Sequence, residues 1–328
     1  MLVWALGTSV ALWLALAVDR WWGEPRAHWH PVVWIGHYLA WAGRWVQRRT
    51  VQEPGAADWR AFWLGALVWC AGAAMVCVAA WALQEALQTL PWGLAALGTG
   101  LLLKPLLAWA MLRSEVQAVE CALDPAQGGS LAVGRERLSW LVSRDVAQLT
   151  DTQVRESAIE TLAENLNDSV VAPIFWFVLL GLPGAALYRF ANTADAMWGY
   201  PGVYKGHNWA WAGKWAARVD DVLSWLPARI TALLLLLVSS VRGPGLAARL
   251  RQEARQTPSP NSGWPMAAMA LVLDVGLRKP GVYVLNATGR SAAAPDTARA
   301  LAYASHALLA LMLIVQAALL LIAAGGTP

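Results

Sequence analysis

Four acidic side chains recur at intervals of four residues in the stretch ESAIETLAENLNDSVVAPIFW, which begins at residue 156. They are Glu156, Glu160, Glu164 and Asp168. On an α-helix each step of four residues advances the azimuth by about 40°, so all four fall within an arc of about 120° on one face. Like charges at this spacing repel one another, and the repulsion grows where the dielectric constant is low. The row ends directly at an apolar segment.

Two interpretations of this acidic face remain open from the residues alone. It can be a solvated face with Arg144 and Arg155 as counter-charges. Acids at a membrane boundary, however, commonly serve a ligand, an ion or a proton. Mg²⁺ takes oxygen ligands and often uses one or two carboxylates together with substrate phosphates. The flanking apolar sequence favours a metal–phosphate site, to which Asn165 and Asn167 can add neutral oxygens or donors.

Two further polar groups can carry chemistry. Asn192, Thr193 and Asp195 place an amide, a hydroxyl and an acid within four residues, although Asn192 or Thr193 can equally be a helix N-cap. Asp221 follows a second acid, and it can simply pair with Arg218 at i,i+3. Because adjacent acids point in different directions on a helix, we expect only one of these two acids to face a site.

The stretch SPNSGW has the composition of a tight turn, and its Asn261 can also hold an anionic ligand. The first polar region contains a cluster of three histidines, His28, His30 and His37. A zinc site is not expected there, because no fourth ligand at a suitable spacing is evident. The sequence contains no GxxxxGK[ST] loop, no GxGxxG after a strand and no GxSxG elbow. Nucleotide chemistry in this chain needs a site of another kind.

The elements that must position these groups are membrane helices. The chain is 58% hydrophobic and only 14% charged, whereas soluble domains are roughly a quarter charged. About 20 consecutive apolar residues span a bilayer. We predict an all-α polytopic integral membrane protein with about four to six membrane-embedded helices. The uncharged blocks are Leu2–Val18, Ala61–Gln84, Pro91–Leu112 (apart from Lys104), Ile230–Val241 and Ala300–Ala324.

The first block is expected to be a retained helix and not a secretory signal, because no positively charged region precedes it. The block Val170–Phe190 is interrupted by Gly181-Leu-Pro-Gly, which predicts a re-entrant or half-span that pairs with the segment before Val241. We predict one membrane-embedded catalytic domain over residues 1–328. Its polar regions, at about 19–60, 113–169, 192–229 and 242–299, converge on one site.

Tryptophan and charge also fit a membrane protein. Many of the 22 tryptophans stand near the ends of apolar blocks, where amphipathic rings favour the membrane–water boundary. The net charge of +4 suits a surface that faces anionic lipid or phosphorylated ligands. Nucleic acid is not expected as a partner, because no Lys/Arg tract is interleaved with aromatic residues.

An ordered set of motifs covers most of the chain, from about Asp19 to Arg290. The motifs are GEP followed by HPVVWIG, LVSRD, AIETLAENLNDSVVAPIFW, GLPGAALYRFANTADAMWGY, KWAARVDD with LPARI, and SPNSGWPMAAMA. Together they resemble the adenosylcobinamide-phosphate synthase family (CobD/CbiB) of cobalamin biosynthesis. The chain departs from the family pattern at NTADAM, where the family usually reads NTLDSM.

The resemblance implies an inner-membrane ligase, with its active site on the cytoplasmic side. It would join adenosylcobyric acid to an aminopropanol phosphate in an ATP-dependent, amide-forming step. The expected partners are these substrates and membrane lipid. A homo-oligomer and a complex with later enzymes of the pathway are both compatible with it. The alternatives are a transporter, a sensory membrane protein, or a scaffold of a corrinoid pathway.

Residue types suggest roles in such a reaction. A carboxylate is a poor electrophile, so the step is expected to pass through an acyl phosphate, and phosphoryl transfer needs Mg²⁺ and cations. We predict Glu160, Glu164 and Asp168 as ligands of Mg²⁺. The predicted catalytic residues are Asp195 or Asp221, which takes the amine proton, and the phosphate-binding cation Lys205. The predicted substrate- and phosphate-binding residues are Arg144, Asn165, Asn192, Thr193, Arg229 and Asn261.

Overall fold

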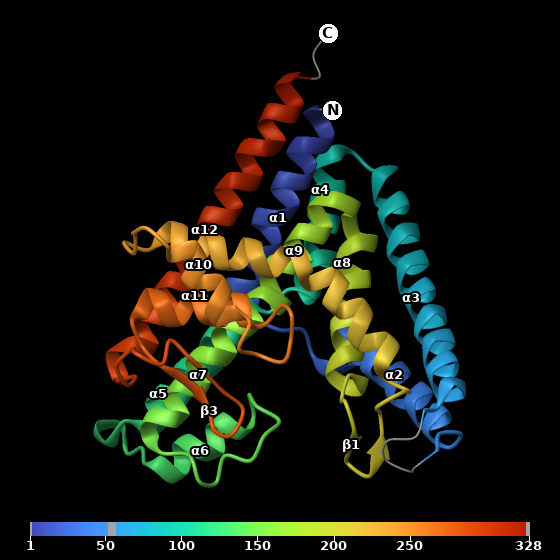
Figure 1. Ribbon diagram of the computed structural model, residues 1–328. Coiled ribbons are helices and arrows are strands. Elements are labelled where there is room, and N and C mark those ends of the chain that lie inside the picture. The colour runs from blue at the N-terminus through green and yellow to red at the C-terminus, as the bar shows by residue number, and fades with distance from the viewer. Residues whose placement is uncertain (1, 52–56, 326–328) are drawn as a thin grey trace. The chain divides into compact units, whose positions relative to one another are not determined.

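The computed structural model describes residues 2–51 and 57–325, and nearly all of its regular structure is helical (Figure 1). Six helical segments within the described residues are long and apolar enough to cross a membrane. The predicted fold class is therefore confirmed. The six segments are Leu2–Trp22, Trp59–Gln88, Trp92–Leu123, Asp151–Trp198, Lys214–Val238 and Ala294–Gly325.

The chain divides into two compact units. Unit 1 comprises residues 1–108, 172–224 and 317–328, and unit 2 comprises residues 109–171 and 225–316. The prediction of a single catalytic domain stays a prediction.

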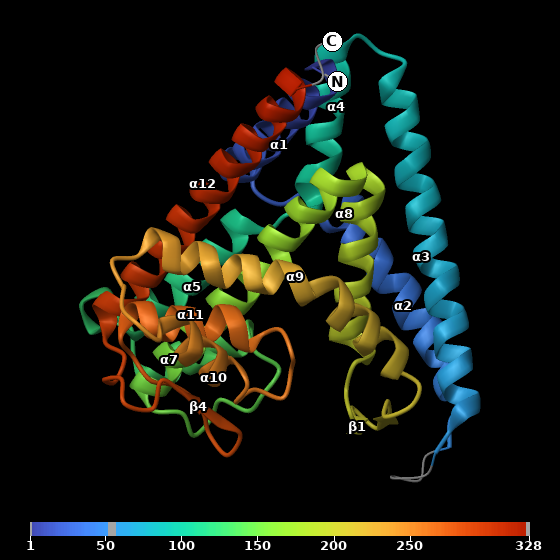
Figure 2. The ribbon, with the colours of Figure 1, turned by 45° about the horizontal axis from the view of Figure 1, so that its top comes forward.

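Unit 1 is built from long helices. Helix α1 packs along α4, α3 packs along α8, and α2 contacts both α3 and α8 (Figure 2). Its core gathers Leu39, Phe190, Trp198 and Trp209. The elements are α1 (Leu2–Trp22), α2 (Pro31–Gln47), α3 (Trp59–Gln88), α4 (Trp92–Leu103), α8 (Ala172–Trp198), β1 (Val203–Tyr204), β2 (His207–Asn208) and the first part of α9 (Lys214–Val238). Short 3-10 turns occur at Ala27–Trp29 and Lys104–Leu106.

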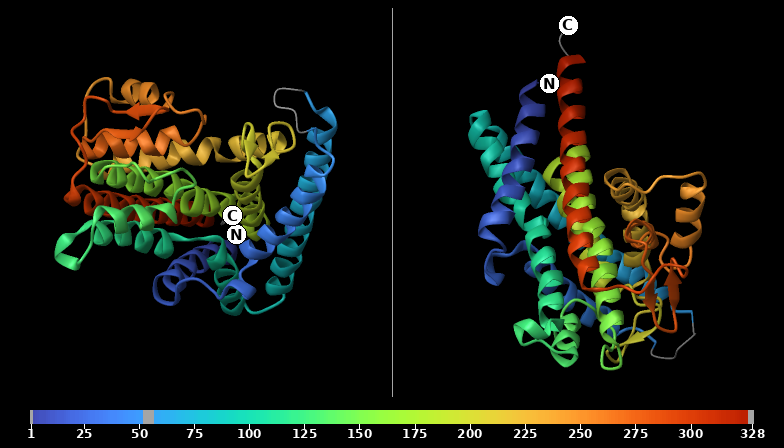
Figure 3. Two further views of the ribbon diagram at one scale, coloured as in Figure 1. Left: turned by 90° about the horizontal axis from the view of Figure 1, so that it is seen from below. Right: turned by 90° about the vertical axis from the view of Figure 1, so that its left-hand side faces the viewer.

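Unit 2 is centred on α7. This helix contacts α5, α6 and α11, and also strand β3 of a two-stranded hairpin; its packing can be followed in Figure 3. The elements are α5 (Trp109–Leu123), α6 (Leu131–Ser139), α7 (Asp151–Leu166), the rest of α9, α10 (Leu246–Ala254), α11 (Gly263–Leu273), β3 (Leu277–Lys279), β4 (Tyr283–Leu285) and most of α12 (Ala294–Gly325).

Local signals in the sequence set the limits of α6 and α7. Asp124 caps a 3-10 turn at Pro125–Gln127, and Gly128, which takes a left-handed conformation with φ 76°, ends that turn. Thr150 and Gln153 form a capping box at the start of α7. The 3-10 turn at Pro125–Gln127 thus separates α5 from α6, and α7 follows α6 along the chain.

The acidic helix continues into α8 through a π-helical turn at Asn167–Val171. Farther along, Gly181 leaves the helical region with φ 68° and ψ −157°. Gln84 on α3 accepts a hydrogen bond from the Leu182 amide at 2.8 Å, which satisfies a backbone donor that the break releases. The break predicted at Gly181-Leu-Pro-Gly is confirmed, whereas re-entry and pairing with the segment before Val241 stay predictions.

The N-cap interpretation of Asn192 and Thr193 is wrong. Both residues lie inside α8, and the Thr193 hydroxyl donates to the carbonyl of Arg189, four residues earlier, at 2.6 Å. A side chain that bonds back to its own helix is a feature of the helix interior.

Replacing Gly181 with alanine tests the break. The new Cβ would lie 2.2 Å from the Gln84 Oε1 atom, at a φ that side chains disfavour. We expect G181A to lower the free energy of unfolding by roughly 1–3 kcal/mol. The measurement is the thermal unfolding midpoint of purified protein in detergent. The matched control is G93A on α4, where a Cβ meets nothing within 4 Å and the midpoint should hold or rise. Equal midpoints for the two variants would contradict this account.

Candidate functional site

The twelve residues predicted for the site fall in both compact units. Seven belong to unit 2: Arg144, Glu160, Glu164, Asn165, Asp168, Arg229 and Asn261. Five belong to unit 1: Asn192, Thr193, Asp195, Lys205 and Asp221. The contacts around the acidic row lie in unit 2.

The four acids of α7 and the π-helical turn differ in burial along the row. Glu156 is fully buried and Glu160 is 5% exposed, whereas Glu164 and Asp168 are half-buried. The interpretation as a solvated acidic face is therefore wrong for the first two acids. A buried carboxylate needs partners, because desolvation of an unpaired charge is costly.

Glu160 meets two partners from distant parts of the sequence. Its Oε1 atom accepts a hydrogen bond from the hydroxyl of Tyr283 on β4. Its Oε2 atom lies 3.4 Å from the Arg144 Nη2 atom, which also donates to the Ser157 hydroxyl at 2.7 Å. The structure thus brings together two predicted residues, Arg144 and Glu160.

Glu156 is paired from the same hairpin. Its Oε1 atom accepts from Arg278 Nη1, on β3, at 2.5 Å. Arg155, in contrast, pairs with Glu120 at 2.9 Å and with Asp151 at 3.0 Å. Of the two counter-charges expected for the acidic face, Arg144 is confirmed, while Arg155 pairs with acids outside it.

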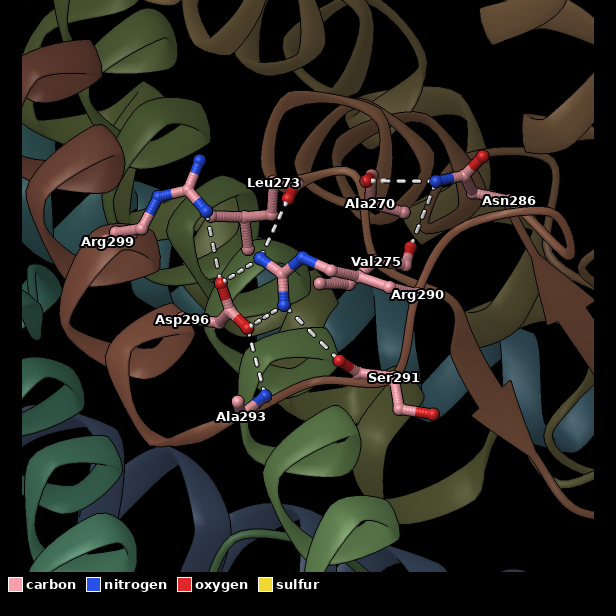
Figure 4. Close-up of polar contacts among 9 residues, drawn as sticks. All are labelled: Ala270, Leu273, Val275, Asn286, Arg290, Ser291, Ala293, Asp296 and Arg299. Atoms are coloured by element: carbon pink, nitrogen blue, oxygen red, sulfur yellow. Dashed lines mark hydrogen bonds and ion pairs between the residues drawn. The ribbon is translucent and has the colours of Figure 1, made fainter.

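The hairpin that supplies Tyr283 and Arg278 is followed by two residues, Asn286 and Arg290, whose polar contacts hold it in place (Figure 4). Asn286, at φ 50°, donates to the carbonyls of Ala270 and Val275 at 3.3 and 3.1 Å. Arg290 donates hydrogen bonds to both carboxylate oxygens of Asp296 at 2.6 Å, in the bidentate geometry that arginine favours. These contacts tie the hairpin to α11 and to the first turn of α12.

The charge around Tyr283 keeps its hydroxyl protonated. Burial raises the pKa of Tyr283 well above its ordinary value, and the negative charges of Glu160 and Glu164 raise it further. The phenol therefore remains a hydrogen-bond donor to Glu160. The charge of Glu164 acts on the same hydroxyl.

The end of the acidic row meets α9. Asn167 donates to the Asp168 carboxylate at 2.7 Å, and it accepts from the Thr231 hydroxyl at 3.2 Å. The Asn165 amide instead donates to the carbonyl of Thr161 at 3.1 Å, within its own helix.

Arg229 and Asn261 are also brought together. The Arg229 Nη1 atom donates to Asn261 Oδ1 at 2.6 Å and to the Trp225 carbonyl at 2.7 Å, while its Nη2 atom donates to the Pro260 carbonyl at 3.1 Å. The Ser259 hydroxyl accepts from the amides of Asn261 and Ser262. The tight turn predicted for SPNSGW is therefore confirmed, and Arg229 holds it in place.

The predicted residues of unit 1 lie on three elements. Asn192, Thr193 and Asp195 are half-buried on α8, and Asp221 is half-buried on α9. Lys205 is exposed at the turn between β1 and β2, with its ammonium 5.2 Å from the centre of the Tyr204 ring. The catalytic roles of Asp195, Asp221 and Lys205 stay predictions.

No group of three or more His, Cys, Asp or Glu side chains in the described part of the chain is arranged to hold a metal ion. The oxygens of Glu160 are engaged by Tyr283 and Arg144, whereas Glu164 and Asp168 are half-exposed acids one turn apart. Two carboxylates fit the mode in which Mg²⁺ is completed by substrate phosphates. The assignment of Mg²⁺ to this row stays a prediction.

Tyr283 and Arg278 were not predicted from the sequence as partners of the acidic row. The available signal was the sequence RKPGVY, in which Pro280-Gly281 separates two short runs and favours a hairpin. A hairpin alone does not reveal which helix its side chains meet.

Comparison with known proteins supplies the family. The model of the CobD/CbiB protein family matches residues 12–314. The chain belongs to the CobD/CbiB family. It is 39% identical over 281 residues to a probable cobalamin biosynthesis protein CobD of Methanothermobacter thermautotrophicus, covering 84% of this chain and 85% of that one. It is 33% identical to cobalamin biosynthesis protein CobD of Brucella anthropi, covering 95% and 97% of the two chains.

A third relative, the cobalamin biosynthesis protein CobD of Chromobacterium violaceum, is 39% identical over 83% of this chain and 82% of its own. No solved structure matches this member of the CobD/CbiB family. The resemblance inferred from the ordered motifs is confirmed, because the match extends across both compact units and includes the acidic row.

Removing the Tyr283 hydroxyl tests the buried contact. We expect Y283F to lower the free energy of unfolding by about 1–3 kcal/mol, since Glu160 loses a buried donor. The raised pKa of Tyr283 gives the sign of the pH dependence. The contribution is complete below the ordinary pKa of about 10 and is lost as pH rises above it.

The measurement is the unfolding midpoint of wild type and Y283F between neutral pH and the alkaline limit of the detergent. The gap between them should narrow above pH about 10. Y303F is the control, because no hydrogen bond of the half-buried Tyr303 hydroxyl occurs in the described part of unit 2. A gap that stays constant with pH would contradict the proposed state of the phenol.

Proposed function

We propose that the protein is an adenosylcobinamide-phosphate synthase, which forms an amide between adenosylcobyric acid and an aminopropanol phosphate at the expense of ATP. The observation that carries the proposal is the family match over residues 12–314. Relatives that share up to 39% identity with the chain are named for cobalamin biosynthesis, which supports a role in that pathway and a corrinoid substrate.

The proposed reaction has two steps. A carboxylate oxygen of adenosylcobyric acid attacks the γ-phosphorus of ATP, and ADP leaves. The amine nitrogen then attacks the carbonyl carbon of the acyl phosphate, phosphate leaves with the C–O bonding pair, and the nitrogen gives its proton to a base. The first step needs charge neutralisation around the phosphates. The second needs the base and a positioned amine.

The half-buried end of the acidic row suits the first step. We propose that Glu164 and Asp168 hold Mg²⁺, which when bound neutralises phosphate charge. Glu160 keeps Arg144 and Tyr283 in place beside them, since each of its oxygens has one of these partners. The Arg144 Nη1 and Nε atoms are buried and have no hydrogen-bond partner in the described part of the chain. We propose that these two donors bind a phosphate oxygen of the substrate.

The location of the polar groups supports an enzyme over a transporter. Transporters bind substrate near the bilayer midplane, between broken helices. Here the acidic row occupies the polar first part of the segment Asp151–Trp198, before the apolar residues of α8. Its partners come from Arg144 and from the β3–β4 hairpin, both outside the candidate membrane spans. We propose a site at the membrane edge, on the cytoplasmic side of the cell membrane.

An assay of purified protein tests the activity. The reaction contains adenosylcobyric acid, aminopropanol phosphate, ATP and Mg²⁺, and the amide product and ADP are measured together by chromatography. We expect stoichiometric formation of both, with none when ATP or Mg²⁺ is omitted. Uptake of the corrinoid into vesicles without an amide product would favour the transport alternative instead.

Glu164 gives the sharpest mutational test of the acidic row. We expect E164Q to reach the membrane in normal amount and to lose amide formation, because the amide keeps the shape but removes the charge that holds Mg²⁺. The measurement is product formation per mass of membrane-extracted protein. E136Q on α6 is the matched control, since Glu136 is exposed on the same unit. Full activity of E164Q would refute the role.

A further inference from the structure

A second concentration of charge in unit 2 is a pocket of about 670 Å³ beside α9 and α10. Its walls contain three arginines, two tryptophans and the turn that precedes α11. Pockets of this size hold small molecules of metabolite dimensions. The lining residues are Trp225, Arg229, Arg251, Ala254, Arg255, Thr257, Pro258, Ser259, Pro260 and Trp264.

The charge of this arginine pocket is uncompensated. Its described lining includes no Asp or Glu, and neither Arg251 nor Arg255 makes an ion pair with a described residue. The nearby Glu253 is engaged elsewhere, because its Oε2 atom accepts from the Asn286 amide at 2.7 Å and from Gln256 at 3.1 Å. Arg251 and Arg255 stand four residues apart and repel each other until an anion arrives.

The third arginine forms a fixed wall of the pocket. The guanidinium of Arg229 lies 4.6 Å from the ring of Trp225 and 4.8 Å from that of Trp264, and three of its hydrogen bonds go to the turn and to α9. Arg229 therefore supplies charge from a set position, while Arg251 and Arg255 have their N–H groups available.

The arginine pocket is linked to the end of the acidic row. Thr231, two residues after Arg229 on α9, donates to Asn167, which in turn donates to Asp168. One segment of α9 thus carries both an arginine of the pocket and a contact to the proposed Mg²⁺-binding acids.

We propose that the arginine pocket binds the phosphate of a phosphorylated substrate, with Arg251 and Arg255 as its main ligands. Arginine forks match phosphate oxygens in bidentate pairs, and these charge-assisted hydrogen bonds are stronger than neutral ones. The identity of the substrate rests on the proposed function, which offers two phosphate compounds, ATP and aminopropanol phosphate. An anionic lipid headgroup carries the same chemistry, since α10 is basic and amphipathic.

The test is equilibrium binding to protein reconstituted in bilayers made only of phosphatidylcholine, which removes anionic lipid. ATP, aminopropanol phosphate and inorganic phosphate are each titrated against wild type and the double variant R251A/R255A. For one of the two substrates, we expect the Kd of the double variant to rise by roughly tenfold to 100-fold. The affected compound identifies which substrate the pocket holds.

Two controls make the result specific. R60A/R113A removes the same charge from exposed arginines outside the pocket, and its Kd values should match those of wild type. R251K/R255K keeps the charge but not the forks, and it should recover only part of the affinity. An equal loss of substrate affinity in R60A/R113A would show that net charge, and not the pocket, controls binding, and this would overturn the proposal.

Failure of the pocket and failure of the proposed function give different results. Wild-type affinity for both substrates in R251A/R255A, with an active wild-type enzyme, overturns the pocket alone. The third outcome concerns lipid. If wild type loses substrate affinity when phosphatidylglycerol is added to the bilayer, and R251A/R255A matches wild type in pure phosphatidylcholine, the arginines bind lipid and substrate binding is overturned. Substrate binding that depends on Arg251 and Arg255, without any amide product from wild type, supports the pocket and refutes the ligase.

Discussion

The buried carboxylate of Glu160 is the constraint on which unit 2 depends. A charge at 5% exposure is tolerated only if it is paired and hydrogen-bonded. Tyr283 and Arg144 meet this requirement from β4 and from the segment before α7. Removing one partner of a buried pair is strongly destabilising, because it leaves the other charge buried and unpaired. The contact therefore holds together three segments of the chain, of which Arg144 and Tyr283 lie 139 positions apart.

The remaining polar contacts of unit 2 follow from holding the hairpin against α7. Arg278 neutralises Glu156 from the adjacent strand, so the hairpin offsets two buried charges of one helix face. Asn286 and the Arg290–Asp296 pair anchor the same hairpin to α11 and α12. The first two acids of the row therefore serve structure. The last two, at the helix end, are half-exposed and can serve a ligand.

Sequence reasoning predicted the features that depend on local chemistry. The apolar blocks predicted the membrane helices, and Gly181-Leu-Pro-Gly predicted the break in α8. It did not predict which acids are buried, because burial depends on a hairpin about 120 residues later in the chain. The π-helical turn was also beyond reach, since no residue pattern in NDSVV distinguishes it from an α-helix. Such turns are frequent at functional sites.

Lys104 illustrates the same limit in unit 1. The sequence marks it as the one charge in an apolar block, and burial at 3% exposure requires a partner. Its ammonium lies 2.7 Å from Glu24 and 3.4 Å from Asp19, both at or just after the end of α1. The local sequence thus indicates that Lys104 needs an acidic partner, and the packing of α1 on α4 determines which acid that is.

The two charge concentrations of unit 2 are complementary in a way that suits chemistry on phosphates. Acids that bind a divalent cation and arginines that bind phosphate would attract each other into ion pairs if they were in contact, and the site would be neutralised before substrate arrived. Within the described residues of unit 2, Glu156 and Glu160 are paired with Arg278 and Arg144, whereas Arg251 and Arg255 make no ion pair. Segregation of this kind costs stability through like-charge repulsion. In the proposed function, a bound phosphate offsets the repulsion between Arg251 and Arg255, and that repulsion is then a source of substrate affinity.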